Sequence, residues 1–363
     1  MTATAAVAGC MMLLLSPQVS VAAARKGMEL WWNTVVPSLL PFFIFTDMLM
    51  AAGIHRTIGR ELKRPVSFLL GVPGEAAFVF VSSILSGYPT GARLTAELRR
   101  SGSITQDQAR DMLNFCSTSG PLFIVGAVGT GMLGDCHAGY IILAAHCTGA
   151  IVTGMIMNPG SLLNRADKRN AALYSDVSYN SRSYKNESYK SEIYTNGKLL
   201  EAHKMEDAPA GVMQAASDAV LRSLKTIGMI GGFIIIFTII TEYATRAGDA
   251  AATALASRAP GAQTAASAEI AEIIHYITTA VSGMLEMTVG CSRVCSMQEV
   301  GMNIKTTLCA FLVSFGGLSV TAQTAGVLRG TDISMSHYIR AKLMHGLISA
   351  ALTVTMIFLQ TIK

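Results

Sequence analysis

The stretch from Leu85 to Arg93 combines residues that break a helix with residues that bind an anion. Pro89 suits the first turn of a new helix, and the flanking glycines let another backbone approach closely. A helix that begins inside a membrane exposes unpaired N–H groups and the positive end of its dipole, which attract a carboxylate or a phosphate. Arg93, one turn in, either adds a charge with bidentate geometry or lies at the headgroup level as part of a surface helix. The candidate binding residues here are Ser86, Gly87, Tyr88, Pro89, Thr90, Gly91 and Arg93.

Two further polar clusters open or interrupt apolar stretches. Four polar side chains within six residues, from Asn114 to Ser119, exceed what a helix cap needs. The segment 314–324 is likewise polar, although a helix that faces lipid should be apolar. We expect both clusters to face a cavity, with a glycine-mediated helix contact as the alternative. The candidate residues are Asn114, Ser117, Thr118, Ser119, Gly120, Ser314, Gly316, Gly317 and Gln323.

Carboxylates are rare in the apolar stretches, and Glu286 is the one with the best claim to function. It follows Ser282-Gly283, which we expect to break a helix and to join the binding site, and its neighbours are apolar. A buried carboxylate in a helix bundle can bind a coupling proton or cation. A salt bridge to Arg293, one heptad onward, is an equally weighted alternative. Asp47 and Glu242 lie near helix ends, where interfacial residues are common.

Other classes of chemistry have no support in the sequence. The seven cysteines include no CxxC pair, and the histidines form no metal motif. No nucleophile–base pair supports an enzyme, and no basic tract indicates a nucleic-acid partner. We therefore predict a non-enzymatic protein with no cofactor and no metal.

The composition places these candidates in a membrane. Of 363 residues, 51% are hydrophobic and 14% charged, against about 25% charged in soluble domains. The mean hydropathy is +0.44, and the abundant glycine and methionine suit packed helices. We predict an all-α polytopic membrane protein with about 8–9 membrane segments, some of them discontinuous or re-entrant. The expected spans are 3–24, 35–53, 66–86, 117–134, 138–158, 227–245, 268–290, 305–327 and 340–361.

The two apolar halves carry weak, ordered similarity. Ile44-Phe45-Thr46 matches Ile236-Phe237-Thr238, and each half has an opening helix, a break at Ser-Gly, a second break at glycine and a closing helix. Two broken-helix repeats are typical of secondary transporters. We expect an N-terminal helix and amphipathic connection (1–34), a first repeat (35–158), a polar disordered linker (159–210) and a second, inverted repeat (211–361). Basic residues place the linker in the cytoplasm, but charge leaves the topology of 54–110 open.

Three motifs in order resemble a known family. They are Pro37-Ser38-Leu39-Leu40-Pro41-Phe42-Phe43-Ile44, Ser86-Gly87-Tyr88-Pro89-Thr90-Gly91-Ala92 and Ser117-Thr118-Ser119-Gly120-Pro121-Leu122-Phe123. They are similar to the YlbJ-type (SpoVV) sporulation integral membrane proteins, within the nucleoside-recognition or "Gate" group. The resemblance covers nearly the whole chain except 160–210, whose recurring tyrosines depart from the compact family pattern.

The resemblance implies a carrier that moves dipicolinate, a small aromatic dianion, across the outer forespore membrane of endospore-forming bacteria. It would assign one carboxylate to the segment Gly87–Gly91 with Arg93, the other to Asn114 and Ser117–Ser119, the ring to Tyr88, and ion coupling to Glu286. The alternatives are a carrier of nucleosides or another small solute, and a non-transporting scaffold for spore-envelope assembly. The expected partners are a small anionic solute and the lipid bilayer, and association into homo-oligomers is left open.

Overall fold

A computed structural model describes residues 2–51, 54–158, 212–256 and 265–361, and within these ranges every regular element is a helix. The polar linker predicted at 159–210 therefore lies outside the described residues. The chain is described again from Val212, where α11 begins. The elements are α1 (Thr2–Leu15), α2 (Pro17–Leu30), η1 (Trp31–Val35), α3 (Val36–Ala51), α4 (Ile54–Leu70), α5 (Glu75–Ser86), α6 (Thr90–Arg100), α7 (Gln106–Leu113), η2 (Phe123–Leu133), α8 (Cys136–Met157), α11 (Val212–Ala256), α12 (Ala265–Leu285), α13 (Met287–Ser296), α14 (Met302–Phe315), α15 (Gly317–Val327) and α16 (Met335–Thr361). Of these, η1 and η2 are π-helical.

The all-α class is confirmed, whereas the predicted number of spans is not. In the described part of the chain, four stretches are long and apolar enough to cross a membrane: Cys136–Met157, Ala216–Ala251, Met302–Val327 and Met335–Thr361. The pair Thr57–Leu70 and Glu75–Ser86 would be a fifth if counted as one span, but it is bent by 105°. Several of the other expected spans contain helices that are too short to cross a membrane, because each helix ends at a break in the backbone.

Most of the predicted breaks occur where glycine or proline forces them. Pro73-Gly74 lies in the bend between α4 and α5, and α5 ends at Ser86, directly before Gly87 with φ of 69°. Gly316 and Gly317, with φ of 85° and 71°, separate α14 from α15. These positive φ angles favour glycine because it has no Cβ to clash.

Three sequence predictions need correction. The break expected at Ser282-Gly283 lies at Glu286, because the carboxylate of Glu286 caps α13 by accepting from the Val289 N–H (2.7 Å). The first expected span, 3–24, is two helices, with α1 ending before Ser16 and α2 starting at Pro17. The expected span 227–245 is the middle of a longer helix, because α11 runs without a break from Val212 to Ala256.

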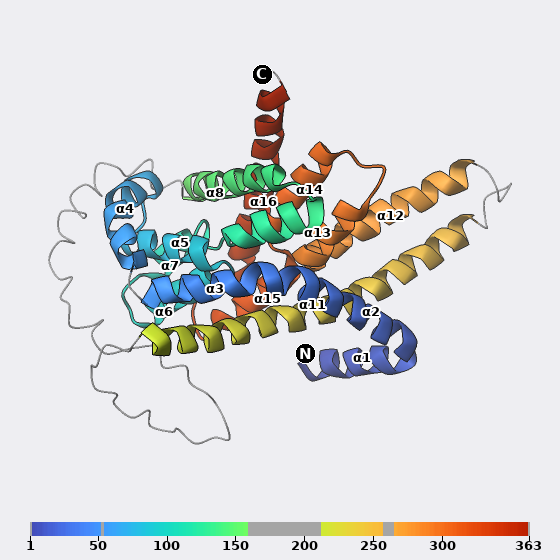
Figure 1. Ribbon diagram of the computed structural model, residues 1–363, viewed down its shortest axis with the longest axis horizontal. Helices are drawn as coiled ribbons and strands as arrows, with labels where there is room; N and C mark the ends of the chain where they lie inside the picture. Colours follow the sequence, from blue (N-terminus) through green and yellow to red (C-terminus); the bar gives the residue numbers. More distant parts are fainter. Residues whose placement is uncertain (1, 52–53, 159–211, 257–264, 362–363) are drawn as a thin grey trace.

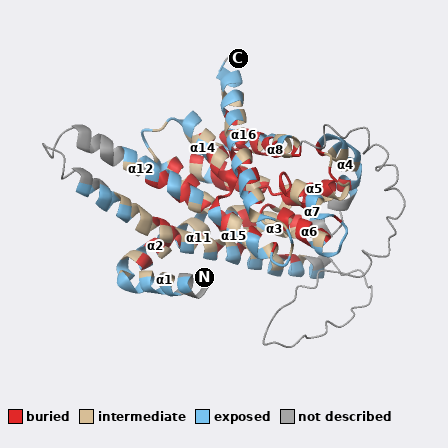
Figure 2. Cartoon of the chain, turned by 180° about the vertical axis from the view of Figure 1, so that it is seen from behind, coloured by how far each residue is buried: buried red, intermediate tan, exposed pale blue. Residues whose placement is uncertain are grey.

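The two sequence halves are interleaved. Helix α16 packs against α8 and α14, and α11 packs against α2 and α3 (Figure 1). One cluster of buried apolar side chains joins Val35 and Phe123 of the first half to Ile234, Val289 and Val313 of the second. Buried residues concentrate where these helices meet, whereas α1 and the C-terminal end of α16 are largely exposed (Figure 2). That the halves are inverted copies stays a prediction.

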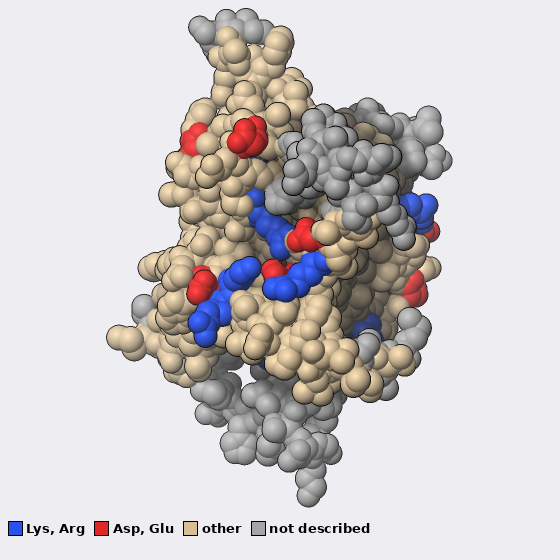
Figure 3. Space-filling model, turned by 90° about the vertical axis from the view of Figure 1, so that its right-hand side faces the viewer, with Lys and Arg blue, Asp and Glu red and all other residues tan. Residues whose placement is uncertain are grey.

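Most of the face seen in Figure 3 is uncharged, and side chains of both charges lie around its centre, with a few acidic ones apart above them. Glu242 of α11 pairs with Lys26 of α2 and with Arg246, each at 3.4 Å. Asp47 of α3 pairs with Arg222 of α11 at 2.7 Å. The predicted interfacial carboxylates thus tie α11 to its neighbours.

The connection between α15 and α16 is anchored to the first half by Arg99 of α6. Its guanidinium donates to both carboxylate oxygens of Asp332, Nε to Oδ1 at 3.0 Å and Nη2 to Oδ2 at 2.8 Å. These hydrogen bonds hold the pKa of Asp332 below its ordinary value. The bidentate pair lies outside the candidate spans.

Acid is expected to weaken this anchor. A lowered carboxyl pKa adds stability that is present above the ordinary aspartate pKa of about 4 and is lost as the pH falls through the lowered value. Asp332→Asn should therefore lower the unfolding temperature slightly at pH 7 and flatten its decline below pH 4. Thermal unfolding in detergent from pH 7 to pH 3 measures both, and identical pH profiles for the two proteins would contradict the anchor's role.

Candidate binding pocket

Two broken segments of the first half cross with their backbones in contact. A Cβ added to Gly87 would lie 2.9 Å from the backbone nitrogen of Gly120, and one added to Gly91 would overlap the carbonyl oxygen of Cys116. Only glycine fits at such a crossing. The segment 86–91 and the segment 114–121, which comes between α7 and η2, therefore form one crossed pair.

The second half contains a corresponding crossed pair. A Cβ added to Gly317 would lie 3.2 Å from the carbonyl oxygen of Leu285, and one added to Gly290 would overlap the backbone of Gly283. Gly283 thus permits a close approach between α12 and α13 and does not itself break α12. The break at Glu286 and the break at Gly316 meet here.

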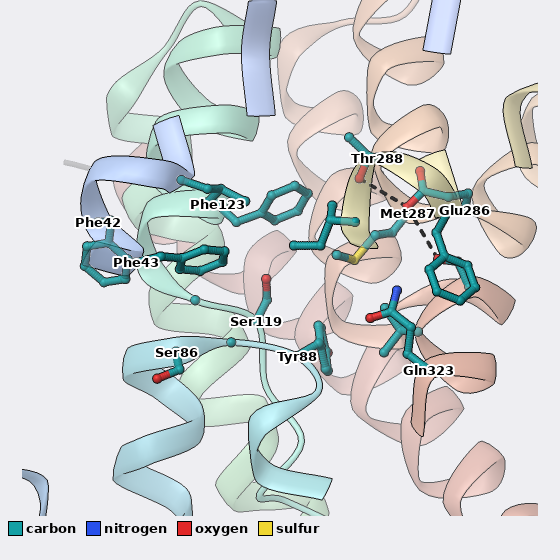
Figure 4. Close-up of a pocket in the computed structure, with 17 residues that line it drawn as sticks. Phe42, Phe43, Ser86, Tyr88, Ser119, Phe123, Glu286, Met287, Thr288 and Gln323 are labelled. Carbon is teal, nitrogen blue, oxygen red and sulfur yellow. Dashed lines mark hydrogen bonds between the residues drawn. The ribbon is translucent and has the colours of Figure 1, made fainter. Parts of the chain in front are cut away.

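A pocket lies between the two crossed pairs and draws its lining from both. Phe42, Phe43 and Phe123 lie on one side of it, and Glu286 and Gln323 on the other (Figure 4). Ser119 and Tyr88 come between them in this view. The cavity is narrow, about 50 Å³, and it is partly open to the outside. The lining residues are Leu39, Phe42, Phe43, Ser86, Gly87, Tyr88, Ser119, Gly120, Phe123, Ile230, Phe233, Glu286, Met287, Thr288, Ser319, Val320 and Gln323.

Glu286 supplies the carboxylate of this pocket and is only 3% exposed. Besides the Val289 N–H, it accepts from Thr288 Oγ1 at 3.2 Å and from Ser319 Oγ at 3.4 Å. The alternative of a salt bridge to Arg293 is wrong: Nη1 of that residue donates to Thr245 Oγ1 at 2.9 Å, and no described basic side chain pairs with Glu286. The carboxylate is held by neutral donors alone.

The structure gathers part of the predicted site and disperses the rest. The predicted residues in the lining are Ser86, Gly87, Tyr88, Ser119, Gly120, Glu286 and Gln323. The predicted residues outside it are Pro89, Thr90, Gly91, Arg93, Asn114, Ser117, Thr118, Ser282, Gly283, Ser314, Gly316 and Gly317. Arg93 is half-buried in the first turn of α6.

Several polar side chains outside the lining hold the breaks in place. Asn114 Nδ2 donates to Asn158 Oδ1 at 2.6 Å, and Asn114 Oδ1 lies 2.8 Å from Nε2 of His337. The hydroxyl of Ser117 bonds to that of Tyr338 at 3.0 Å. Asn114 and Ser117 thus join the 114–121 segment to the start of α16.

Two more hydroxyls outside the lining, those of Thr118 and Ser282, also have protein partners. Thr118 Oγ1 lies 2.9 Å from Ser83 Oγ of α5, and Ser282 Oγ donates to the Thr278 carbonyl at 2.6 Å. These contacts account for polar residues that the sequence assigned to a ligand.

Residues that the sequence reasoning missed include Phe42, Phe43 and Phe233, which give the pocket its aromatic wall. Two buried ionisable side chains of α16 were also missed: Lys342, which contacts Tyr88 of the lining, and His345, which contacts Lys342. The sequence did carry a signal for Lys342 and His345, because ionisable residues inside an apolar span are rare and are usually functional. In the described part of the chain, no group of three or more histidine, cysteine or acidic residues could hold a metal ion.

Comparison with known proteins identifies the family. The chain is 32% identical over 334 residues to the sporulation integral membrane protein YlbJ of Bacillus subtilis (strain 168), covering 92% of this chain and 76% of that protein. The chain belongs to the YlbJ family of sporulation integral membrane proteins. The family name and the long apolar helices identify the chain as an integral membrane protein. No family model and no solved structure matches the chain.

Proposed function

We propose that this protein is a membrane carrier for a small aromatic carboxylate, with dipicolinate the leading candidate, across the outer forespore membrane during sporulation. The observation that carries the proposal is the pocket between two crossed pairs of broken segments. Secondary transporters bind their solutes where discontinuous helices of two repeats meet.

The lining suits a planar solute with polar groups at its edge. Phenylalanine rings from α3, η2 and α11 form the apolar wall, and aromatic rings pack on one another with about 0.5–1.5 kcal/mol beyond area burial. Ser86, Ser119 and Gln323 offer hydroxyl and amide donors to carboxylate oxygens.

Glu286 favours coupling to a cation. A dianion bound about 6 Å from an ionised carboxylate would be repelled by roughly 3 kcal/mol per pair of charges at an effective dielectric constant of about 20. A proton or metal cation taken up at Glu286 removes that repulsion. Solute and cation would then bind together, which is the basis of cotransport.

Uptake into liposomes that hold the purified protein tests the proposal. We expect saturable accumulation of dipicolinate that adenosine does not inhibit. Arg93→Gln should keep most of the uptake, because Arg93 lies outside the pocket lining. Uptake of adenosine in place of dipicolinate would favour a nucleoside carrier.

A scaffold is the second candidate and is tested separately. Deletion of 160–210 should leave uptake unchanged if the protein is a carrier. Folded protein that moves neither solute, with a sporulation defect on deletion of 160–210, would favour the scaffold.

A further inference from the structure

A lysine side chain is buried behind the pocket wall. Lys342 of α16 is 1% exposed. Its Nζ lies 2.6 Å from the Tyr88 hydroxyl, 2.9 Å from the Ser117 carbonyl oxygen and 3.2 Å from His345 Nδ1. These three contacts account for all the donors of an ammonium group.

The surrounding hydrogen bonds suit the charged form of Lys342. His345 Nε2 lies 2.9 Å from the His146 carbonyl, which can only accept, so the proton is on Nε2 and Nδ1 must accept from Lys342. The Tyr88 hydroxyl can accept from Lys342 while it donates to the Val313 carbonyl at 3.2 Å. With three acceptors around one nitrogen, the charged form uses all three of its N–H groups.

The neighbouring ring of His146 adds no second charge. Its Nε2 accepts from the Ser119 N–H at 3.0 Å, so its proton is on Nδ1, which lies 2.7 Å from Ser314 Oγ. Lys342 forms no ion pair with any described carboxylate. A buried charge that lacks an opposite charge is costly in a membrane protein, and such residues commonly serve function.

The ammonium is separated from the pocket by the side chain of Tyr88. Tyr88 lines the pocket, and Lys342 Nζ lies 4.7 Å from the centre of its ring. Ser119, which is hydrogen-bonded to the same cluster through His146, also lines the pocket. The positive charge of the ammonium form thus lies one side chain away from a bound solute.

We infer that Lys342 is the specificity-determining residue that makes the pocket prefer an anion over a neutral solute of the same shape. This inference rests on the proposed function, deepens it, and moves the decisive charge from Arg93 to α16. No described carboxylate pairs with Lys342, so an anionic solute would supply the opposite charge. Tyr88 would separate the solute from the ammonium group.

Binding in detergent tests the inference independently of transport. The probes are dipicolinate and pyridine-2,6-dimethanol, a neutral analogue of the same shape, titrated by calorimetry into wild type, Lys342→Gln, Lys342→Arg and Lys305→Gln. Lys305 serves as the matched control, because its Nζ bonds to the Cys295 carbonyl at 2.9 Å outside the pocket.

We expect Lys342→Gln to weaken dipicolinate binding at least about tenfold and binding of the neutral analogue less than about twofold. Lys305→Gln should change neither. Equal loss for both probes, or no loss for either, would overturn the inference.

Lys342→Arg decides the matter if the glutamine variant does not fold, because it keeps the charge. A folded arginine variant should still prefer dipicolinate, and loss of that preference would overturn the inference. Equal binding of both probes by wild type would also overturn it, whatever the variants do. Wild type that binds dipicolinate selectively but transports none would instead reject the proposed function and leave the inference intact.

Discussion

Gly91→Ala is expected to prevent stable folding. The added methyl group would overlap the carbonyl oxygen of Cys116 and lie 2.8 Å from Ser83 Oγ, so the two segments could not cross as they do. Both neighbours are buried, and a backbone carbonyl cannot rotate away as a flexible side chain can. We expect a loss of at least about 4 kcal/mol, which places the variant among the most damaging substitutions. The yield of monodisperse protein in detergent and its unfolding temperature measure the effect.

Gly326→Ala is the matched control for this prediction. Gly326 lies in α15 with nothing within 4 Å of an added Cβ. Alanine there should be neutral or stabilise the helix by about 0.5–1 kcal/mol. If both variants were equally stable, the close crossing at Gly91 would be wrong.

Glu286→Gln is expected to abolish the dependence of uptake on a cation gradient while the protein stays folded. The amide oxygen of glutamine can still accept from Val289 and cap α13, but the side chain no longer takes up a cation. Coupling free energies between two bound ligands typically correspond to about 5–150-fold in affinity, and we expect the loss of accumulation to fall in that range. Uptake into liposomes with and without imposed proton and sodium gradients measures it.

Glu242→Gln provides the control, because Glu242 pairs with Lys26 and Arg246 and does not line the pocket. Its gradient-driven uptake should match that of wild type. Full accumulation by the Glu286→Gln variant would assign coupling to another residue. The proposal for Lys342 would be unaffected, since it concerns the choice of solute.

The breaks were predictable because their causes are local. Gly87, Gly316 and Gly317 adopt positive φ angles, and a glycine there is visible in the sequence. The break at Glu286 was misplaced because Gly283 resembles a helix breaker locally, whereas its role is to let α13 approach, a contact that sequence spacing does not show.

The candidate site was only half predictable for a similar reason. Ser119 and Gln323 could be named because polar residues interrupt apolar stretches. Which polar residues face a cavity depends on long-range partners: Asn114 is engaged by Asn158 and His337, and neither contact follows from sequence separation. Lys342 lies within the unbroken helix α16, so a search for helix breaks passed over it, although an ionisable residue in an apolar span is itself a signal.

The crossed pairs constrain how the cavity can open. Where Gly87 approaches Gly120, and Gly317 approaches the Leu285 carbonyl, main chain lies against main chain with no side chain between to change rotamer. If the protein is the proposed carrier, we expect the two members of each pair to move together. Alternating access would have to be a rocking of one unit against the other, with the aromatic and polar walls of the pocket as the surfaces that part.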